Sequence, residues 1–273
     1  MANEKNQRPP TMNESADYCN MDEDSCLIPF QGFKFLHGDL DILVDRVIKD
    51  SVSRPMPYHF VNAYSMAKSV TEPNLRPVLC KVALVCDSKP MARVLRLGCK
   101  FISQVRGIDF MRLFLAKDTQ NTHFFLGTTE ATLNEVIKAA ASRNPNLRIA
   151  GWYAPPFRLL AEESLNDWIL KIRTAKADIV WVGLGTPKQN YVVDRLSSEL
   201  SLTTFAVGAA FDFMAGTVTE APNWTRKLYL EWAWRFIQEP RRLFMRYALG
   251  NLIFMVLIVK HLFFLLRLQM RRK

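Results

Sequence analysis

The chain has 273 residues, of which 49% are apolar and 23% are charged, as expected for a globular protein with one core or one core and an appendage. Its net charge of +10 is uneven, because residues 224–273 hold 11 Lys or Arg and 2 acidic residues, a net +9. This basic segment is too apolar over 249–268 to be a nucleic-acid arm, and we recognise no nucleic-acid-binding motif. We therefore exclude nucleic acid as a partner and expect an anionic membrane surface.

The N-terminal residues 1–27 are polar and contain no apolar signal core. We predict that they are disordered and that the folded part of the chain is cytoplasmic. Asp39 and Asp41 then form a D-x-D pair of the kind that can hold a divalent ion. The pair opens an amphipathic helix, so an N-cap and a first-turn acid account for both carboxylates. We predict no metal site and no cofactor.

Between residues 28 and 221, short apolar runs alternate with stretches of helix-like apolar spacing. The predicted strands are 59–61, 82–86, 123–126, 148–150, 179–183 and 204–207. The predicted helices between them are 63–70, 90–97, 131–143, 165–175 and 189–200. This alternation indicates an α/β fold, with a Rossmann-like, mostly parallel sheet and helices on both of its faces.

Polar residues and glycines follow several of these strands, at the edge where open α/β sheets bind ligands. They are Asn62, Asp87, the loop residues Gly183, Gly185 and Pro187 with Gln189 beyond them, and Asp212. The loop before Gln189 places backbone N–H groups at a helix start, which suits a nucleotide diphosphate. From the residues alone, the three Asn and Asp side chains could also be helix or turn caps, and the glycines a plain strand-to-helix turn.

From about residue 222 to residue 273 the pattern is helical only, and it is interrupted at Glu239-Pro240. Four arginines recur there at helical spacing beside tryptophans: Arg235, Arg241, Arg242 and Arg246. In the apolar run 249–268, Lys260 is central, and a central Lys costs about 2.5–3.5 kcal/mol in a membrane span. We predict a helix lying in the membrane plane, while a span and a buried core helix stay open. Its predicted lipid-facing residues are Leu252, Phe254, Met255, Ile258, Leu262, Leu265 and Leu266.

Several motifs occur in a fixed order. They are G-L-G-T-P-K-Q-N at 183–190, V-G-A-A-F-D-F-M-A-G at 207–216, A-P-N-W at 221–224, and the segment from Glu231-Trp232 through Glu239-Pro240-Arg241 to Arg246-Tyr247. Over about 28–247 the chain thereby resembles the WecG/TagA/CpsF family of glycosyltransferases, which extend polyprenyl-diphosphate-linked sugars during bacterial surface-polymer synthesis. It departs from the family pattern at Phe60, Ser88, Asn190 and Glu220, where Thr, Gly, Glu and Arg are usual.

The resemblance implies an inverting, metal-independent transfer of a hexose-type sugar from a UDP-sugar to a polyprenyl-diphosphate-linked saccharide. N-acetylmannosamine, its uronic acid and glucose are candidate sugars. Asp87 would be the catalytic base, and Asn62, Gly183, Gly185, Pro187, Gln189, Asp212 and the four arginines would bind substrate. The enzyme would be peripheral on the cytoplasmic face of the bacterial inner membrane, and a homo-oligomer is left open.

A second interpretation is a non-catalytic family member that binds UDP-sugar or lipid-linked sugar and scaffolds a polysaccharide assembly complex. A dinucleotide-dependent oxidoreductase is disfavoured, because no G-x-G-x-x-G follows an early strand.

Overall fold

A computed structural model describes residues 27–97, 102–118, 120–157, 162–222, 224–225 and 231–271 of the chain. The segment predicted to be disordered, 1–27, lies outside this part except for Leu27.

The described residues form one eight-stranded sheet with the strand order β1-β2-β4-β3-β8-β7-β5-β6. The strands are β1 (Leu27–Phe30), β2 (Phe33–Leu36), β3 (Pro57–Val61), β4 (Ala83–Cys86), β5 (Thr122–Gly127), β6 (Arg148–Tyr153), β7 (Ile179–Gly183) and β8 (Thr203–Ala206). β1 is antiparallel to β2, and every other neighbouring pair is parallel. The predicted α/β class is therefore confirmed.

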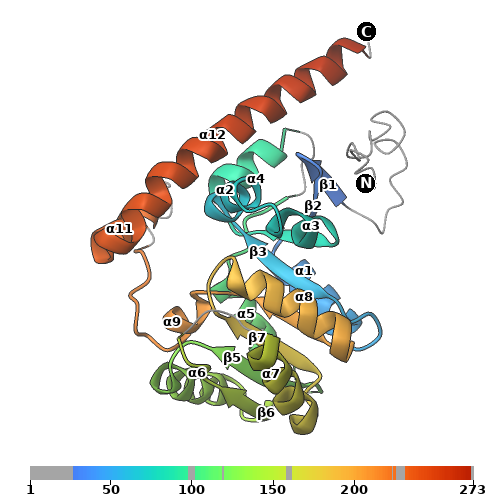
Figure 1. Ribbon diagram of the computed structural model, residues 1–273, viewed down its shortest axis with the longest axis vertical. Helices are drawn as coiled ribbons and strands as arrows, with labels where there is room; N and C mark the ends of the chain where they lie inside the picture. Colours follow the sequence, from blue (N-terminus) through green and yellow to red (C-terminus); the bar gives the residue numbers. More distant parts are fainter. Residues whose placement is uncertain are drawn as a thin grey trace, which may run out of the picture.

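Helices cover both faces of this sheet (Figure 1). Those before the appendage are α1 (Leu40–Asp50), α2 (Ala63–Thr71), α3 (Leu75–Cys80), α4 (Lys89–Leu95), α5 (Gly107–Lys117), α6 (Glu130–Arg143), α7 (Glu162–Ala175), α8 (Lys188–Leu200) and α9 (Ala210–Met214). One face packs against α1, α5, α6 and α9, around the buried rings of Phe110, Trp181 and Phe205. The other packs against α2, α3, α7 and α8.

Each strand predicted within the core is present, with bounds that differ by at most three residues. The sequence analysis missed the β1–β2 hairpin, whose two-residue turn places Gln31 and Gly32 at φ values of 53° and 84°. Such a turn usually contains Asn-Gly or Asp-Gly, so a Gln at its first position does not predict a hairpin. The core was predicted to start at residue 28, and this residue lies in the first strand of the hairpin. The hairpin adds an antiparallel edge to the sheet.

The sheet has a topological switch point between its two central strands, β3 and β8. The chain leaves β3 toward α2 on one face and leaves β8 toward α9 on the other. Residues that follow β3, β4, β7 and β8 therefore converge at one edge. This is the position where open α/β sheets bind ligands.

The described part of the predicted appendage, residues 222–273, includes α11 (Glu231–Gln238) and α12 (Pro240–Arg271), which meet at the predicted break before Pro240. α12 crosses one end of the molecule and continues beyond the sheet (Figure 1). One face of α12 packs against α2 and the β1–β2 end, through Phe254 and Leu257, which are 4% and 7% exposed. Phe254 was therefore assigned wrongly to the lipid-facing set, because this ring faces the protein core.

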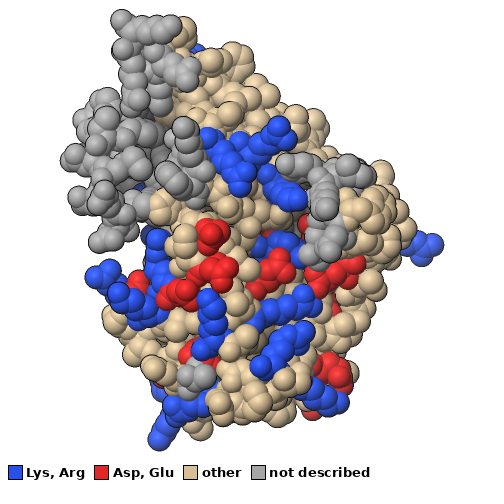
Figure 2. Space-filling model, turned by 180° about the vertical axis from the view of Figure 1, so that it is seen from behind, with Lys and Arg blue, Asp and Glu red and all other residues tan. Residues whose placement is uncertain are grey.

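The opposite face of α12 is apolar and exposed. Leu252, Met255 and Leu266 of the predicted lipid-facing set lie there, with Val259 and Phe263. Ile258, Leu262 and Leu265 lie between the two faces and are half-buried. The segment Ala248–Arg267 is the one described stretch long and apolar enough to cross a membrane, with a mean hydropathy of 2.2. In the view from behind, acidic and basic side chains alternate across the middle of the molecule (Figure 2).

Candidate active site

Asp87 is the first residue after β4, and its backbone N–H donates to the Val61 carbonyl at the end of β3 (2.8 Å). It does not cap the following helix. Ser88 takes the N-cap position of α4 and accepts from the Met91 N–H (3.4 Å). Within the described part of the chain, the Asp87 carboxylate makes no hydrogen bond and no ion pair. The sequence left open whether Asp87 is a helix cap, and the structure gives that role to Ser88.

The surroundings of Asp87 favour its protonated form. Burial raises the pKa of this carboxyl from 3.8 to about 7, and Glu231 and Asp109 add to the increase. Arg106 and Arg235 oppose it, because a nearby cation stabilises the carboxylate. A carboxyl that titrates near neutral pH is suited to proton transfer at that pH.

Asn62, the residue after β3, lies beside Asp87 because β3 and β4 are paired up to Val61 and Cys86. Its Oδ1 accepts from the Tyr64 and Ser65 N–H groups (3.1 and 3.3 Å), so Asn62 is the N-cap of α2. Its Nδ2 group makes no hydrogen bond to any described residue. The cap fixes the side chain and leaves two N–H donors at the edge of the sheet, so a role in substrate binding stays a prediction.

The loop after β7 is held by Gln189. Its Oε1 accepts from the Gly185 N–H (3.0 Å), and its Nε2 donates to the Ala206 carbonyl at the end of β8 (3.3 Å). The side chain is 3% exposed, so it joins the ends of β7 and β8. Its predicted contact with substrate stays a prediction.

The glycines of this loop have different surroundings. A Cβ on Gly183 would lie 2.7 Å from the Phe211 ring, which explains why Gly is needed there. Gly185 has a φ of 76°, and a Cβ there would meet no atom within 4 Å. Pro187 is the N-cap residue of α8. Of this loop, Gly185 therefore borders open space, where a ligand could approach the backbone.

Asp212 lies in the first turn of the short helix α9, with a half-buried side chain. Of the four predicted arginines, the structure brings Arg235 to the site. Its guanidinium lies 5.2 Å from the Phe213 ring centroid, and it makes no ion pair with a described residue. Arg241 is exposed in α12. Arg242 and Arg246 also belong to α12, but their side chains lie outside the described part.

The sequence analysis missed Arg106, the residue before α5. The Val105 N–H donates to the Cys86 carbonyl (2.8 Å), which places this segment next to Asp87. The Arg106 side chain is only 9% exposed and forms ion pairs with Asp109, Glu220 and Glu231. Nothing in the local sequence distinguishes this arginine from a surface one, because two of its partners lie more than 110 residues away.

Two departures from the family pattern are explained by their contacts. Glu220, where an Arg is usual, accepts from both Arg106 and Arg112. Asn190, where a Glu is usual, lies in the core with its Nδ2 3.0 Å from His59 Nδ1. Burial lowers the pKa of His59 to about 3, so this imidazole is neutral and an uncharged partner suits it.

The D-x-D pair follows β2, which is parallel to β4, and both of its carboxylates, at the start of α1, have partners. Asp39 caps α1 by accepting from the Ile42 N–H (3.0 Å), and Asp41 pairs with Lys117 (3.3 Å). Each carboxylate thus has the helix-start position that the sequence predicts.

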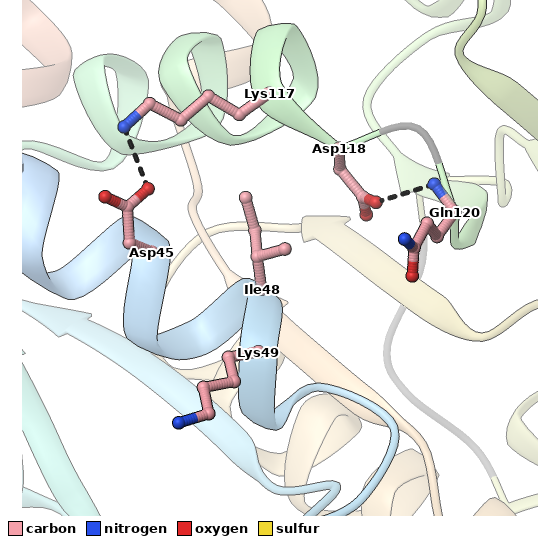
Figure 3. Close-up of a pocket in the computed structure, with 6 residues that line it drawn as sticks. All are labelled: Asp45, Ile48, Lys49, Lys117, Asp118 and Gln120. Carbon is pink, nitrogen blue, oxygen red and sulfur yellow. Dashed lines mark hydrogen bonds and ion pairs between the residues drawn. The ribbon is translucent and has the colours of Figure 1, made fainter.

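A hollow of about 500 Å³ lies at the opposite, amino-terminal edge of the sheet (Figure 3). It is lined by Asp45, Ile48, Lys49, Lys117, Asp118 and Gln120. Lys117 reaches across it to Asp45 (2.8 Å), and Asp118 accepts from the Gln120 N–H (3.1 Å). No predicted site residue lines this hollow. The candidate site residues Asn62, Asp87 and Gly185 follow strands at the carboxyl edge instead.

The glycosyl transferase WecG/TagA/CpsF family matches residues 29–267. The chain belongs to this family. A relative from Bacillus subtilis (strain 168), named N-acetylglucosaminyldiphosphoundecaprenol N-acetyl-beta-D-mannosaminyltransferase, is 29% identical over 146 residues, which are 51% of this chain and 54% of that protein.

A protein of the same name from Staphylococcus aureus (strain MW2) is 29% identical over 155 residues, 54% of this chain and 58% of that protein. The chain thus spans little more than half the length of these relatives. The predicted membership of the WecG/TagA/CpsF family is confirmed.

Proposed function

We propose that this protein is an inverting glycosyltransferase that moves a hexose-type sugar from a UDP-sugar to a polyprenyl-diphosphate-linked saccharide. One observation carries the proposal: in a chain of this family, the Asp87 carboxyl at the end of β4 has a pKa of about 7 and no hydrogen-bond or ion-pair partner among the described residues. Two relatives are named for transfer of N-acetylmannosamine to a lipid-linked N-acetylglucosamine. UDP-N-acetylmannosamine is therefore the first donor to test.

The proposed reaction is a single displacement at the anomeric carbon of the donor. The Asp87 carboxylate takes the proton of an acceptor hydroxyl as the new C–O bond forms. The bond from the anomeric carbon to the diphosphate breaks, and UDP leaves with the electron pair. Attack opposite the leaving group inverts the anomeric centre.

The leaving diphosphate gains charge as its bond to the sugar breaks, so a nearby cation lowers the barrier. Arg235 is suited to this role, because its guanidinium acts electrostatically on Asp87 and is not neutralised by a described carboxylate. The Asn62 Nδ2 donors and the open backbone at Gly185 would orient donor and acceptor.

Two features of α12 support a peripheral location at the membrane. One face of the helix is packed on α2, so lipid cannot surround it in this arrangement. The other face presents a row of exposed apolar side chains, including Leu252 and Phe263 at 64% and 62% exposure. We propose that α12 lies on the cytoplasmic surface of the membrane with this outer face in contact with lipid.

The test is release of UDP from a panel of UDP-sugars in the presence of a synthetic polyprenyl-diphosphate-linked N-acetylglucosamine. We expect one donor to give acceptor-dependent release and an elongated lipid product with inverted anomeric configuration. If the protein binds UDP-sugar but transfers nothing to any acceptor, the non-catalytic scaffold is the correct interpretation.

A further inference from the structure

Arg106 and Glu231 join the edge of the sheet to α11. The Arg106 Nε lies 3.1 Å from the Glu231 Oε1, and both side chains are largely shielded from water. A second contact runs from the Gln238 Nε2 to the Thr219 carbonyl (3.2 Å). α11 is thus fixed at both of its ends.

The Phe213 ring connects this ion pair to Arg235. The Arg106 and Arg235 guanidinium groups lie 5.9 and 5.2 Å from the same ring centroid. Arg235 is one helical turn beyond Glu231 on α11, so the two share a face. The position of Glu231 therefore determines the position of Arg235.

We propose that Arg106 is a positioning residue for the sugar transfer, and that its ion pair with Glu231 holds α11 with Arg235 beside Asp87. The proposal rests on the transferase function proposed above. Arg106 itself is surrounded by carboxylates: its Nη1 lies 3.3 Å from Asp109 and 3.2 Å from Glu220. Its guanidinium is saturated by protein groups. That of Arg235 forms no ion pair with a described residue and can therefore bind a substrate diphosphate.

The same cluster sets the charge around Asp87. The charged groups that act on it are Arg106 and Asp109 at the start of α5 and Glu231 and Arg235 on α11, with the protonated Cys86 thiol next to it in β4. Glu231 raises the pKa of Asp87 and Arg235 lowers it. Movement of α11 would therefore displace Arg235 from the leaving diphosphate, and it would also change the pKa of Asp87.

The principal variant is Glu231→Gln, which keeps the side-chain size and leaves Arg106 its other two carboxylates. Glu220→Gln is the matched control, because it removes a different partner of the same guanidinium from outside α11. We expect single-turnover transfer by Glu231→Gln to fall about tenfold, since small displacements of a positioned group cost rate. The acid limb of its pH–rate profile should move to lower pH, because a negative charge near Asp87 is lost.

Two comparisons distinguish a loss of Arg235 positioning from a general loss of structure. If Glu231 acts through Arg235, the double variant Glu231→Gln/Arg235→Gln should be no slower than Arg235→Gln alone. Hydrogen exchange of the α11 amides, which does not depend on activity, should be faster in Glu231→Gln than in Glu220→Gln. Multiplicative rate losses, or equal exchange in the two single variants, would overturn the proposal. A wild-type protein that transfers no sugar would refute the transferase function, and the exchange comparison would still decide whether Arg106 positions α11.

Discussion

Burial and charge compete at Asp87. Burial alone disfavours the carboxylate, and the two acids Glu231 and Asp109 increase that effect, while Arg106 and Arg235 reduce it. The balance leaves a carboxyl that gains and loses a proton near pH 7. This is the property that a base needs if it must accept a proton in one step and release it before the next.

Asp87→Asn should therefore lower turnover by about 10²–10⁴-fold, the usual contribution of a general base, while UDP affinity changes little. In the wild type, the single-turnover rate should rise with pH through about 7 and level off above it, because only the ionised carboxyl acts as base. The measurement is single-turnover transfer from pH 5 to 9. If the variant keeps more than about a third of wild-type turnover, Asp87 is not the base.

The same substitution should stabilise the fold at alkaline pH. The pKa of Asp87 is raised on folding, so its contribution to stability is present below the ordinary pKa of 3.8 and is lost as pH rises through about 7. Asp87→Asn avoids this loss, and we expect a gain of about 1–2 kcal/mol at pH 8, because the half-buried carboxylate keeps part of its hydration. Denaturant unfolding at pH 4 and pH 8 measures the gain, which should be much smaller at pH 4. An equal gain at both values would contradict the raised pKa.

The sequence was informative about residues whose role follows from local position. Asp87 and Asn62 end apolar runs, so their place at the carboxyl edge could be predicted. It was uninformative about residues whose role depends on distant partners. Arg106 is defined by Glu220 and Glu231, and the engagement of Gln189 depends on the Ala206 carbonyl. Such pairings arise only when the chain folds.

At the scale of elements, α12 shows why a hydrophobic pattern can assign a helix but not its faces. Nearly all of its positions from 249 to 266 are apolar, so the pattern does not distinguish the side that packs on α2 from the side that is exposed. Tertiary contacts decide this. Gly250 lies against Tyr64, and the His261 ring lies 4.7 Å from that of Phe30, both on the inner side.

The outer face of α12 can be tested without removing the helix, whose deletion would uncover the core around Phe254. The triple variant Leu252→Ser/Met255→Ser/Phe263→Ser should lose vesicle binding by roughly 10²-fold or more, since each large apolar side chain contributes about 1.5–3 kcal/mol when buried. Transfer to a water-soluble acceptor should be retained. Flotation with phosphatidylglycerol-containing vesicles measures the binding.

The control is Leu170→Ser on α7, a large apolar residue that is 59% exposed and lies far from the appendage in sequence. It should float like the wild type. Undiminished flotation of the triple variant would show that the outer face of α12 does not contact lipid.

At the scale of the whole molecule, charge and apolar surface are concentrated in the same 50 residues. Residues 224–273 carry nearly all of the net charge, +9 of +10, and also the exposed apolar face of α12. On the face seen in Figure 2, acids and bases alternate across the middle of the protein. A molecule built in this way should bind a surface in one orientation, with the appendage toward it and the sheet behind.

Binding of the full-length protein to vesicles should therefore have a salt-sensitive and a salt-resistant part. Basic residues near an anionic surface contribute about 1 kcal/mol each, and salt screens this attraction. Burial of the apolar face contributes about 25 cal/mol per Å² and is not screened. Flotation with vesicles containing anionic lipid should thus weaken between 0.1 M and 1 M NaCl without disappearing. Binding to vesicles of neutral phosphatidylcholine should be the same at both salt concentrations, and as weak as binding to anionic vesicles at 1 M NaCl. Complete release from anionic vesicles at 1 M NaCl would mean that electrostatic attraction alone holds the protein, and that α12 does not insert its outer face.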